Sequence, residues 1–170
     1  MVKSERERNL GKATGDILKA MYSLQNFGHF SSSGESLPLS EAPIALPSDI
    51  AARTGTSRAF VSKMLQTLEK QGLIEYAPYR GARLTHAGWA SASELSRHHR
   101  LLERFLTDIL GFSPEDAHKE AERLEHVISE EFEARLAAFL QHPQTCPHGA
   151  PIPNLDGSLP LSASFQENRR

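Results

Sequence analysis

Residues 47–84 read PSDIAARTGTSRAFVSKMLQTLEKQGLIEYAPYRGARL, and this stretch decides the fold. Its first residues, Pro47-Ser48-Asp49, offer a side-chain N-cap for a short helix over 49–53, and Thr54-Gly55-Thr56 predicts a turn. Ser57 then caps a longer helix that runs through Lys70. A helix, a turn that contains glycine and a second helix together form a helix-turn-helix motif.

The second of these helices has an apolar face and a polar face. The apolar side chains recur at helical spacing and are expected to be buried: Phe60, Val61, Met64, Leu65 and Leu68. The polar face combines cations with hydrogen-bonding side chains: Ser57, Arg58, Ser62, Lys63, Gln66 and Thr67. Such side chains suit the major groove of DNA, where Arg and Lys contact phosphates and guanine and Gln contacts adenine. An ordinary solvated surface explains them as well.

A β-hairpin is predicted directly after this helix. Residues 73–79 have strand character, Arg80-Gly81 favours a turn, and residues 82–84 form the returning strand. The hairpin is expected to carry Arg80 and Arg83 at its tip, beside the phosphate backbone or a minor groove. Residues 49–83 hold six cations and three anions, which also favours a polyanionic partner. We therefore predict a winged helix-turn-helix domain that binds double-stranded DNA.

Negative charge is concentrated further along the chain, because residues 115–135 hold eight carboxylates and three cations. Within this region, 117–131 (AHKEAERLEHVISEE) is predicted to be one helix with an apolar stripe that needs a partner to bury it. Its polar stripe contains His118, Glu122, Glu125, His126 and Ser129. The two carboxylates and two imidazoles on this face predict a site for a divalent metal. A solvated acidic face is the alternative interpretation.

A second ligand cluster is predicted from the helix over 85–110. His99 and Glu103 share one face of it at a spacing of four residues, and His118 of the next helix joins them. Arg97, His98 and Arg100 are expected to be solvated. The single cysteine, Cys146, excludes an internal disulfide or an all-thiolate metal site. Because no other ligand lies near it in the sequence, no metal site is predicted at Cys146 and His148.

The remaining segments complete a mainly α chain with two predicted domains. Residues 1–85 form the DNA-binding domain, with a mobile arm over 1–12, a helix over 13–27 and an exposed loop over 28–45. Residues 86–145 form a helical metal-binding and dimerisation domain, and 146–170 a linker or tail rich in Pro, Ser and Gly. No signal peptide or membrane span is recognised, so we expect a cytoplasmic protein that is not bound to a membrane.

Several motifs in this order carry a family resemblance. The winged helix-turn-helix is followed by THAG (85–88), HRLLERFLTDILG (99–111), AHKEAERLEHVIS (117–129) and CPHGAPIP (146–153). Together they resemble the metal-dependent repressors of the diphtheria toxin repressor and manganese transport regulator family, over most of residues 13–153. The resemblance implies a homodimeric transcription regulator that binds its operator when Mn²⁺ or Fe²⁺ is bound, and that is not an enzyme.

The resemblance also implies roles for individual residues. The primary metal site matches Asp16, Glu122, Glu125 and His126, and the second or ancillary site matches His99, Glu103 and His118. Ser57, Ala59 and Lys63 fall where members of the family contact the operator.

Three departures from the family pattern bear on the metal. Iron-type members carry Met and Cys where this chain has Asp16 and Glu122, and carboxylates in place of sulfur favour Mn²⁺, with Fe²⁺ as the alternative. Manganese-type members have a Glu where this chain has Lys19, which argues against a closely spaced pair of ions. The SH3-like domain of longer members is absent, so we expect a short form or a truncated chain.

The predicted function is therefore a Mn²⁺-activated dimer that binds operators of metal homeostasis genes, without a small organic substrate. Two alternatives stay open at this point. One is a winged-helix regulator that needs no metal, and the other is a metal-assisted hydrolase, because carboxylates, His and a divalent ion can activate water.

Overall fold

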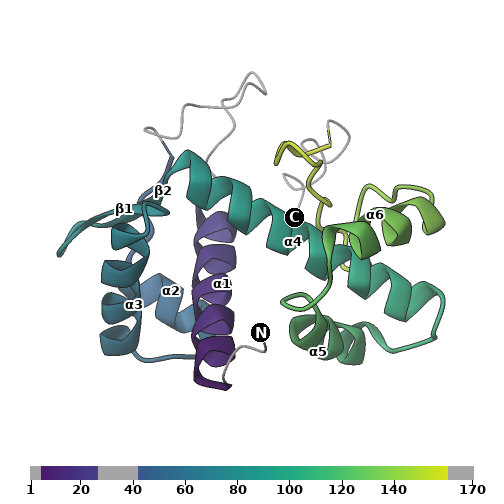
Figure 1. The fold of residues 1–170 in the computed structure, drawn as a ribbon, viewed down its shortest axis with the longest axis horizontal. Coiled ribbons are helices and arrows are strands. Elements are labelled where there is room, and N and C mark those ends of the chain that lie inside the picture. The colour runs from purple at the N-terminus through teal and green to yellow at the C-terminus, as the bar shows by residue number, and fades with distance from the viewer. Residues whose placement is uncertain (1–4, 27–41, 161–170) are drawn as a thin grey trace. The chain divides into compact units, whose positions relative to one another are not determined.

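A computed structural model describes residues 5–26 and 42–160 of the chain. The chain divides into two compact units, Met1–Ala92 and Ser93–Arg170, and each is described by itself. The elements are, in order, α1 (Glu5–Asn26), α2 (Pro47–Thr54), α3 (Arg58–Lys70), β1 (Ile74–Ala77), β2 (Gly81–Leu84), α4 (His86–Asp108), α5 (Pro114–Leu124) and α6 (Glu130–Phe139) (Figure 1). The prediction of a mainly α chain with a winged helix-turn-helix is confirmed.

The helix-turn-helix of the first unit consists of α2 and α3. Gly55 ends α2 in a left-handed conformation (φ 64°), and the Ser57 hydroxyl caps α3 by accepting a hydrogen bond from the amide of Phe60 at 3.2 Å. The prediction of a side-chain cap within Pro-Ser-Asp is wrong. The N-cap is Leu46, whose side chain makes no capping bond, and Pro47 occupies the first turn, where its missing N–H has no cost.

The core of the first unit joins α1 to α3 and the hairpin. Val61, Met64, Leu65 and Leu68 are buried as predicted, together with Ile17, Met21 and Tyr22 of α1. Phe60 is 40% exposed, so its predicted burial is wrong; it lies in the first turn of α3, at the edge of the apolar stripe. Residues 5–12, expected in a mobile arm, form the first turns of α1, because Glu, Arg, Leu and Lys are good helix formers.

The wing is an antiparallel hairpin in which Ile74 pairs with Leu84 and Glu75 with Arg83. Arg80 lies in the turn, but the prediction that Arg83 lies at the tip is wrong. Arg83 is part of β2, and its Nε donates a hydrogen bond of 2.8 Å to the carbonyl of Ala42. Of the predicted loop over 28–45, residues 28–41 lie outside the described residues, and Ala45 forms a bridge with Ala82 of β2.

The second unit contains the rest of α4, together with α5 and α6. The prediction of one helix over 117–131 is wrong, because α5 ends at Leu124 and a new helix begins after Ser129. The Ser129 hydroxyl accepts from the amide of Phe132, and three carboxylates in the first turn of α6 favour this start. Ala117 and Ala121 of the apolar stripe are buried within this unit, against Leu101 and Leu102.

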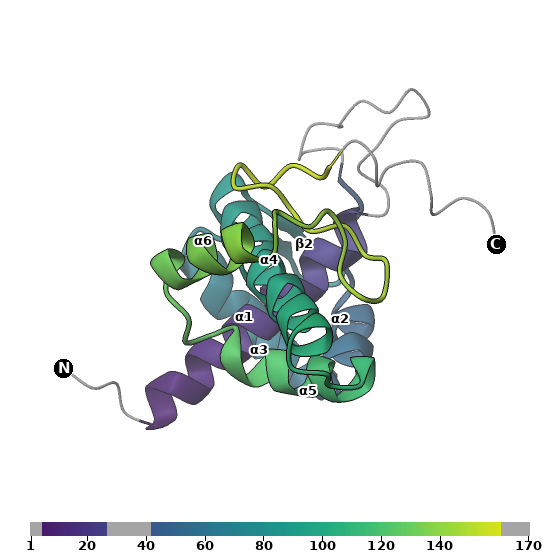
Figure 2. The same cartoon turned by 90° about the vertical axis from the view of Figure 1, so that its right-hand side faces the viewer.

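Residues 142–160, here called the strap, follow α6 and are drawn in yellow-green in Figures 1 and 2. Thr145 and Pro151 form an isolated β-bridge, and Cys146 and Ile152 are buried. Residues 146–153, expected in a linker or tail, therefore pack on the second unit; residues 161–170 lie outside the described part of the chain. Among the described residues no helix is long and apolar enough to cross a membrane.

Candidate metal centre

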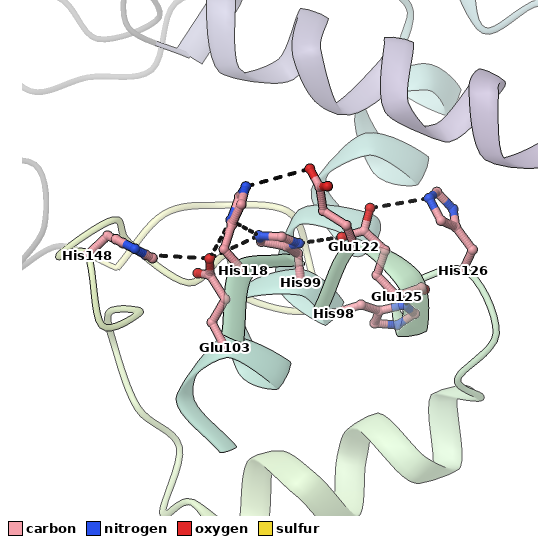
Figure 3. A network of polar contacts seen from close by, with 8 residues as sticks. All are labelled: His98, His99, Glu103, His118, Glu122, Glu125, His126 and His148. Carbon is pink, nitrogen blue, oxygen red and sulfur yellow. Dashed lines mark hydrogen bonds and ion pairs between the residues drawn. The ribbon is translucent and has the colours of Figure 1, made fainter. Parts of the chain in front are cut away.

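Three side chains of the second unit converge on one point. His99 and Glu103 project from α4 one turn apart, and His118 projects from α5 (Figure 3). His99 Nε2 lies 3.1 Å from Glu103 Oε1 and 3.0 Å from His118 Nδ1, and the last two atoms are 2.7 Å apart. We call these three atoms the ligand triangle. The structure therefore brings together all three residues predicted for the second site.

The dimensions of the ligand triangle match the face of a metal coordination shell. Octahedral ions with bonds of about 2.1 Å have neighbouring ligand atoms about 3.0 Å apart, whereas a tetrahedral Zn²⁺ site needs about 3.4 Å. The three observed separations lie between 2.7 and 3.1 Å. The donor set, two imidazoles and one carboxylate, also suits a divalent ion of intermediate hardness. The residues thus fit a divalent metal.

Glu125 orients His99 from the opposite side. Glu125 Oε2 lies 2.5 Å from His99 Nδ1, and because a carboxylate only accepts, the bond assigns the proton to Nδ1. This contact holds the ring so that Nε2 faces the ligand triangle, as in metal sites where a carboxylate orients the ligating histidine. The other oxygen of Glu125 lies 3.3 Å from His126 Nε2, and Glu125 is only 1% exposed.

Glu103 supplies a permanent negative charge in a buried position. Burial alone would raise the pKa of this carboxyl group. Hydrogen bonds from His99, His118 and Cys146 and the charge of His99 outweigh burial and lower the pKa to about 2. Glu103 is therefore ionised at neutral pH, as a metal ligand must be.

Two residues that the sequence interpretation rejected lie beside Glu103. His148 Nδ1 is 3.4 Å from Glu103 Oε1 (Figure 3). It is also 4.0 Å from Cys146 Sγ, so Glu103, Cys146 and His148 form a second triad that shares Glu103 with the first. Burial and the Glu103 charge raise the pKa of the Cys146 thiol. The sequence separates these residues from Glu103 by more than forty positions, and the CPH motif was the one available signal.

The residues predicted for the primary site are distributed over both units. Glu125 and His126 lie in the connection between α5 and α6, and Glu122 Oε1 lies 3.6 Å from His118 Nε2, next to the ligand triangle. Asp16 is on α1 of the first unit. Its role as a ligand, with Glu122, Glu125 and His126, stays a prediction.

The prediction that Arg97, His98 and Arg100 are solvated is wrong. Arg97 Nε bonds Glu133 Oε1 of α6 at 2.5 Å, its Nη1 donates to the carbonyl of Pro153, and Arg100 donates to the carbonyl of Pro151. Burial alone would lower the pKa of His98, but hydrogen bonds to Glu133 and the Glu125 carbonyl, with the charges of Glu133 and Glu94, raise it. These side chains attach α6 and the strap to α4.

The predicted DNA-binding side chains of the first unit lie on α3 and its N-cap, in the wing turn and, for Arg83, on β2. Ser57, Arg58, Ala59, Lys63 and Gln66 are exposed, whereas Ser62 and Thr67 are half-buried. The Thr67 hydroxyl donates to the carbonyl of Lys63. At the wing tip, Tyr79 has a positive φ of 65° and is fully exposed beside the exposed Arg80.

Comparisons with known proteins match both units. A model described as iron dependent repressor, N-terminal DNA binding domain, matches residues 38–82, and one described as iron dependent repressor, metal binding and dimerisation domain, matches residues 85–154. The chain is 43% identical over 115 residues to the iron-dependent repressor IdeR of Mycobacterium tuberculosis, covering 68% of this chain and 50% of that protein. It is 40% identical over 116 residues to the diphtheria toxin repressor of Corynebacterium diphtheriae, covering 68% and 51%.

A solved structure, a manganese-dependent transcriptional repressor in complex with manganese, superposes with a TM-score of 0.72 at 35% identity, covering 86% of this chain and 61% of that one. The chain spans about half the length of the curated relatives it matches.

Proposed function

Because the chain belongs to the family of iron-dependent repressors, we propose that it is a transcription regulator that binds operator DNA when a divalent metal is bound to its second unit. The observation that carries this proposal is the convergence of His99, Glu103 and His118 at distances suited to one ion. The bound metal would supply a fixed positive centre that joins ligands from separate elements. No catalytic step is part of this function.

We assign the metal as Mn²⁺, with Fe²⁺ as the alternative. Oxygen and nitrogen donors suit Mn²⁺ and Fe²⁺, and the solved relative is a manganese-dependent repressor. His99, Glu103 and His118 would hold one ion, with Cys146 and His148 as further ligands on the Glu103 side. Asp16, Glu122, Glu125 and His126 would hold the primary ion, and their lack of sulfur also favours Mn²⁺.

The DNA-binding surface would consist of α3 and the wing tip. Ser57, Ala59 and Lys63 would contact base edges in the major groove, with Arg58, Ser62, Gln66 and Thr67 beside them. Arg80 would contact a phosphate, because it is exposed in the wing turn. Arg83 is less suited to such a contact, since its guanidinium already donates to the Ala42 carbonyl.

A homodimer would bind two half-sites of the operator in the cytoplasm. Ile109, Leu110 and Phe112 follow the end of α4, are between 39% and 54% exposed and offer an apolar surface to a second copy. If metal binding fixes the separation of two α3 helices at about one DNA turn, metal and operator must increase each other's affinity reciprocally.

The test is a selection of duplexes from a random DNA library by the full chain with Mn²⁺, followed by mobility shifts with the selected duplex. We expect a shift with Mn²⁺, loss of the shift with a chelator, and recovery when Mn²⁺ is restored in excess. A shift that persists in the chelator would identify a metal-independent regulator. Failure to select any sequence would refute operator binding.

A further inference from the structure

Glu133 of α6 is a buried carboxylate that lies outside both metal triads. It is 3% exposed and accepts from two side chains of α4, Arg97 at 2.5 Å and His98 at 3.0 Å. A buried charge keeps its place only when it is paired and hydrogen-bonded, and Glu133 is both. We call Arg97, His98 and Glu133 the clamp.

The clamp reaches the metal centre through the ring of His98. Its Nε2 faces Glu133, and its Nδ1 lies 3.3 Å from the backbone carbonyl of Glu125. That carbonyl belongs to the residue at the end of α5, where the helix gives way to the connection that contains His126. The side chain of the same residue orients His99, at 2.5 Å. His98 therefore contacts the backbone of the residue that orients His99.

The clamp also holds the strap. Arg97 donates to the carbonyl of Pro153 at 2.7 Å, and Arg100, one turn further on, donates to the carbonyl of Pro151. Both carbonyls follow Cys146 and His148 closely in the chain, so the contacts limit how far these two can move from Glu103. The Glu133 carboxylate thus holds Arg97 and His98, whose contacts fix the segments that carry both triads.

We propose that Glu133 is a positioning residue of the metal centre: it contacts no metal ligand, yet it fixes Arg97 and His98 so that Glu125, His99 and the strap hold their places around the ion. This inference rests on the proposed function, since it presumes that the triads bind metal. Outer-shell partners of this kind change metal affinity by about 10- to 100-fold when they are replaced.

The test measures binding of Co²⁺ by visible absorbance, and of Mn²⁺ by calorimetry, in the full chain and its variants. Glu133→Gln keeps the size of the side chain and removes its charge. We expect it to lower the affinity for both metals by roughly tenfold or more and to alter the absorbance spectrum of bound Co²⁺. Glu131→Gln is the matched control, because Glu131 lies on the same helix and pairs with Arg135 at the surface. It should bind as the wild type does.

A second pair of variants separates positioning from folding. In His98→Asn the side-chain amide donor takes the place of Nδ1, which faces the Glu125 carbonyl. In His98→Gln the amide donor takes the place of Nε2, which faces Glu133. We expect His98→Asn to retain more metal affinity than His98→Gln at equal helical circular dichroism.

Wild-type affinity in Glu133→Gln, or equal losses in the two His98 variants, would overturn the positioning role. A wild-type chain that binds neither metal would instead refute the proposed function itself.

Discussion

Glu103→Gln is the sharpest single perturbation of the metal centre, because Glu103 is the one residue shared by both triads. Its pKa falls from the ordinary value of 4.5 to about 2 in the folded chain, which favours the ionised form by roughly 3 kcal/mol. The side chain is 3% exposed, so solvent screening reduces this figure little. The amide of the variant cannot ionise. We expect the metal-free variant to lose about 1–3 kcal/mol in its free energy of unfolding at pH 7.

The pH dependence of that loss has a definite sign. A carboxyl group whose pKa is lowered on folding stabilises the native state above its unfolded pKa, and this stabilisation disappears as pH falls through the folded pKa. The wild type and Glu103→Gln should therefore differ most above pH 4.5 and converge toward pH 2. Urea denaturation of the metal-free proteins across this range measures the difference. A constant difference at all values of pH would refute the ionic account of Glu103.

Metal binding gives the functional half of the same prediction. Glu103→Gln should lower the affinity for Co²⁺ and Mn²⁺ by at least about tenfold, because it removes the anionic ligand that both triads share. His148→Ala is the comparison, since it removes one ligand from the second triad alone and leaves the ligand triangle intact. If Glu103→Gln binds metal like the wild type, the ligand triangle is a hydrogen-bonded cluster and not a metal centre.

Four further substitutions and one change of metal have defined outcomes. A Cβ on Gly88 would lie 1.8 Å from the Leu73 carbonyl oxygen, so Gly88→Ala should destabilise the first unit by about 1–3 kcal/mol in urea denaturation despite its better helix propensity. Gln141 has a φ of 58° directly after α6, and Gln141→Gly should raise the free energy of unfolding by about 0.5–1 kcal/mol. Arg80→Ala should lower the affinity for all DNA duplexes alike and reduce the slope of log affinity against log salt concentration by about one. Lys63→Ala should relax the preference for particular bases, measured in competition assays. Zn²⁺ should bind at least as tightly as Mn²⁺ in calorimetry yet activate operator binding less.

The parts of the fold that follow from local chemistry were predictable from the sequence. Ser57 caps α3 and Gly55 ends α2 because each position needs a property of that residue type, a side-chain acceptor in one case and a left-handed backbone in the other. His99 and Glu103 share a face because helical spacing requires it. Such features depend on neighbours within four residues, which the sequence displays directly.

The prediction of one helix over 117–131 was wrong because two local signals, helical periodicity and an N-cap sequence, compete there. Residues 117–131 keep helical periodicity throughout, yet Ser129 followed by three carboxylates starts a new helix and breaks the stripe. The break places Glu125 and His126 in a connection. There, the carbonyl of Glu125 is within reach of His98, and its carboxylate within reach of His99. The polar residues of 117–131 still lie near one another, although the single continuous helix from which we predicted this does not form.

Contacts between distant segments were beyond reach of the sequence, and they decide how the metal centre is enclosed. Arg97, His98 and Arg100 look like an ordinary basic surface because most of their hydrogen-bond partners lie far along the chain. The Glu125 carbonyl is 27 residues from His98, and Glu133 and the strap are 35 or more residues away. The same holds for Cys146 and His148, which become candidate ligands only because the strap folds back to Glu103. The arginines that hold the strap therefore determine whether Glu103 serves one triad or two. Releasing the strap should leave the ligand triangle in place while removing the sulfur ligand, which would shift the metal preference toward harder ions.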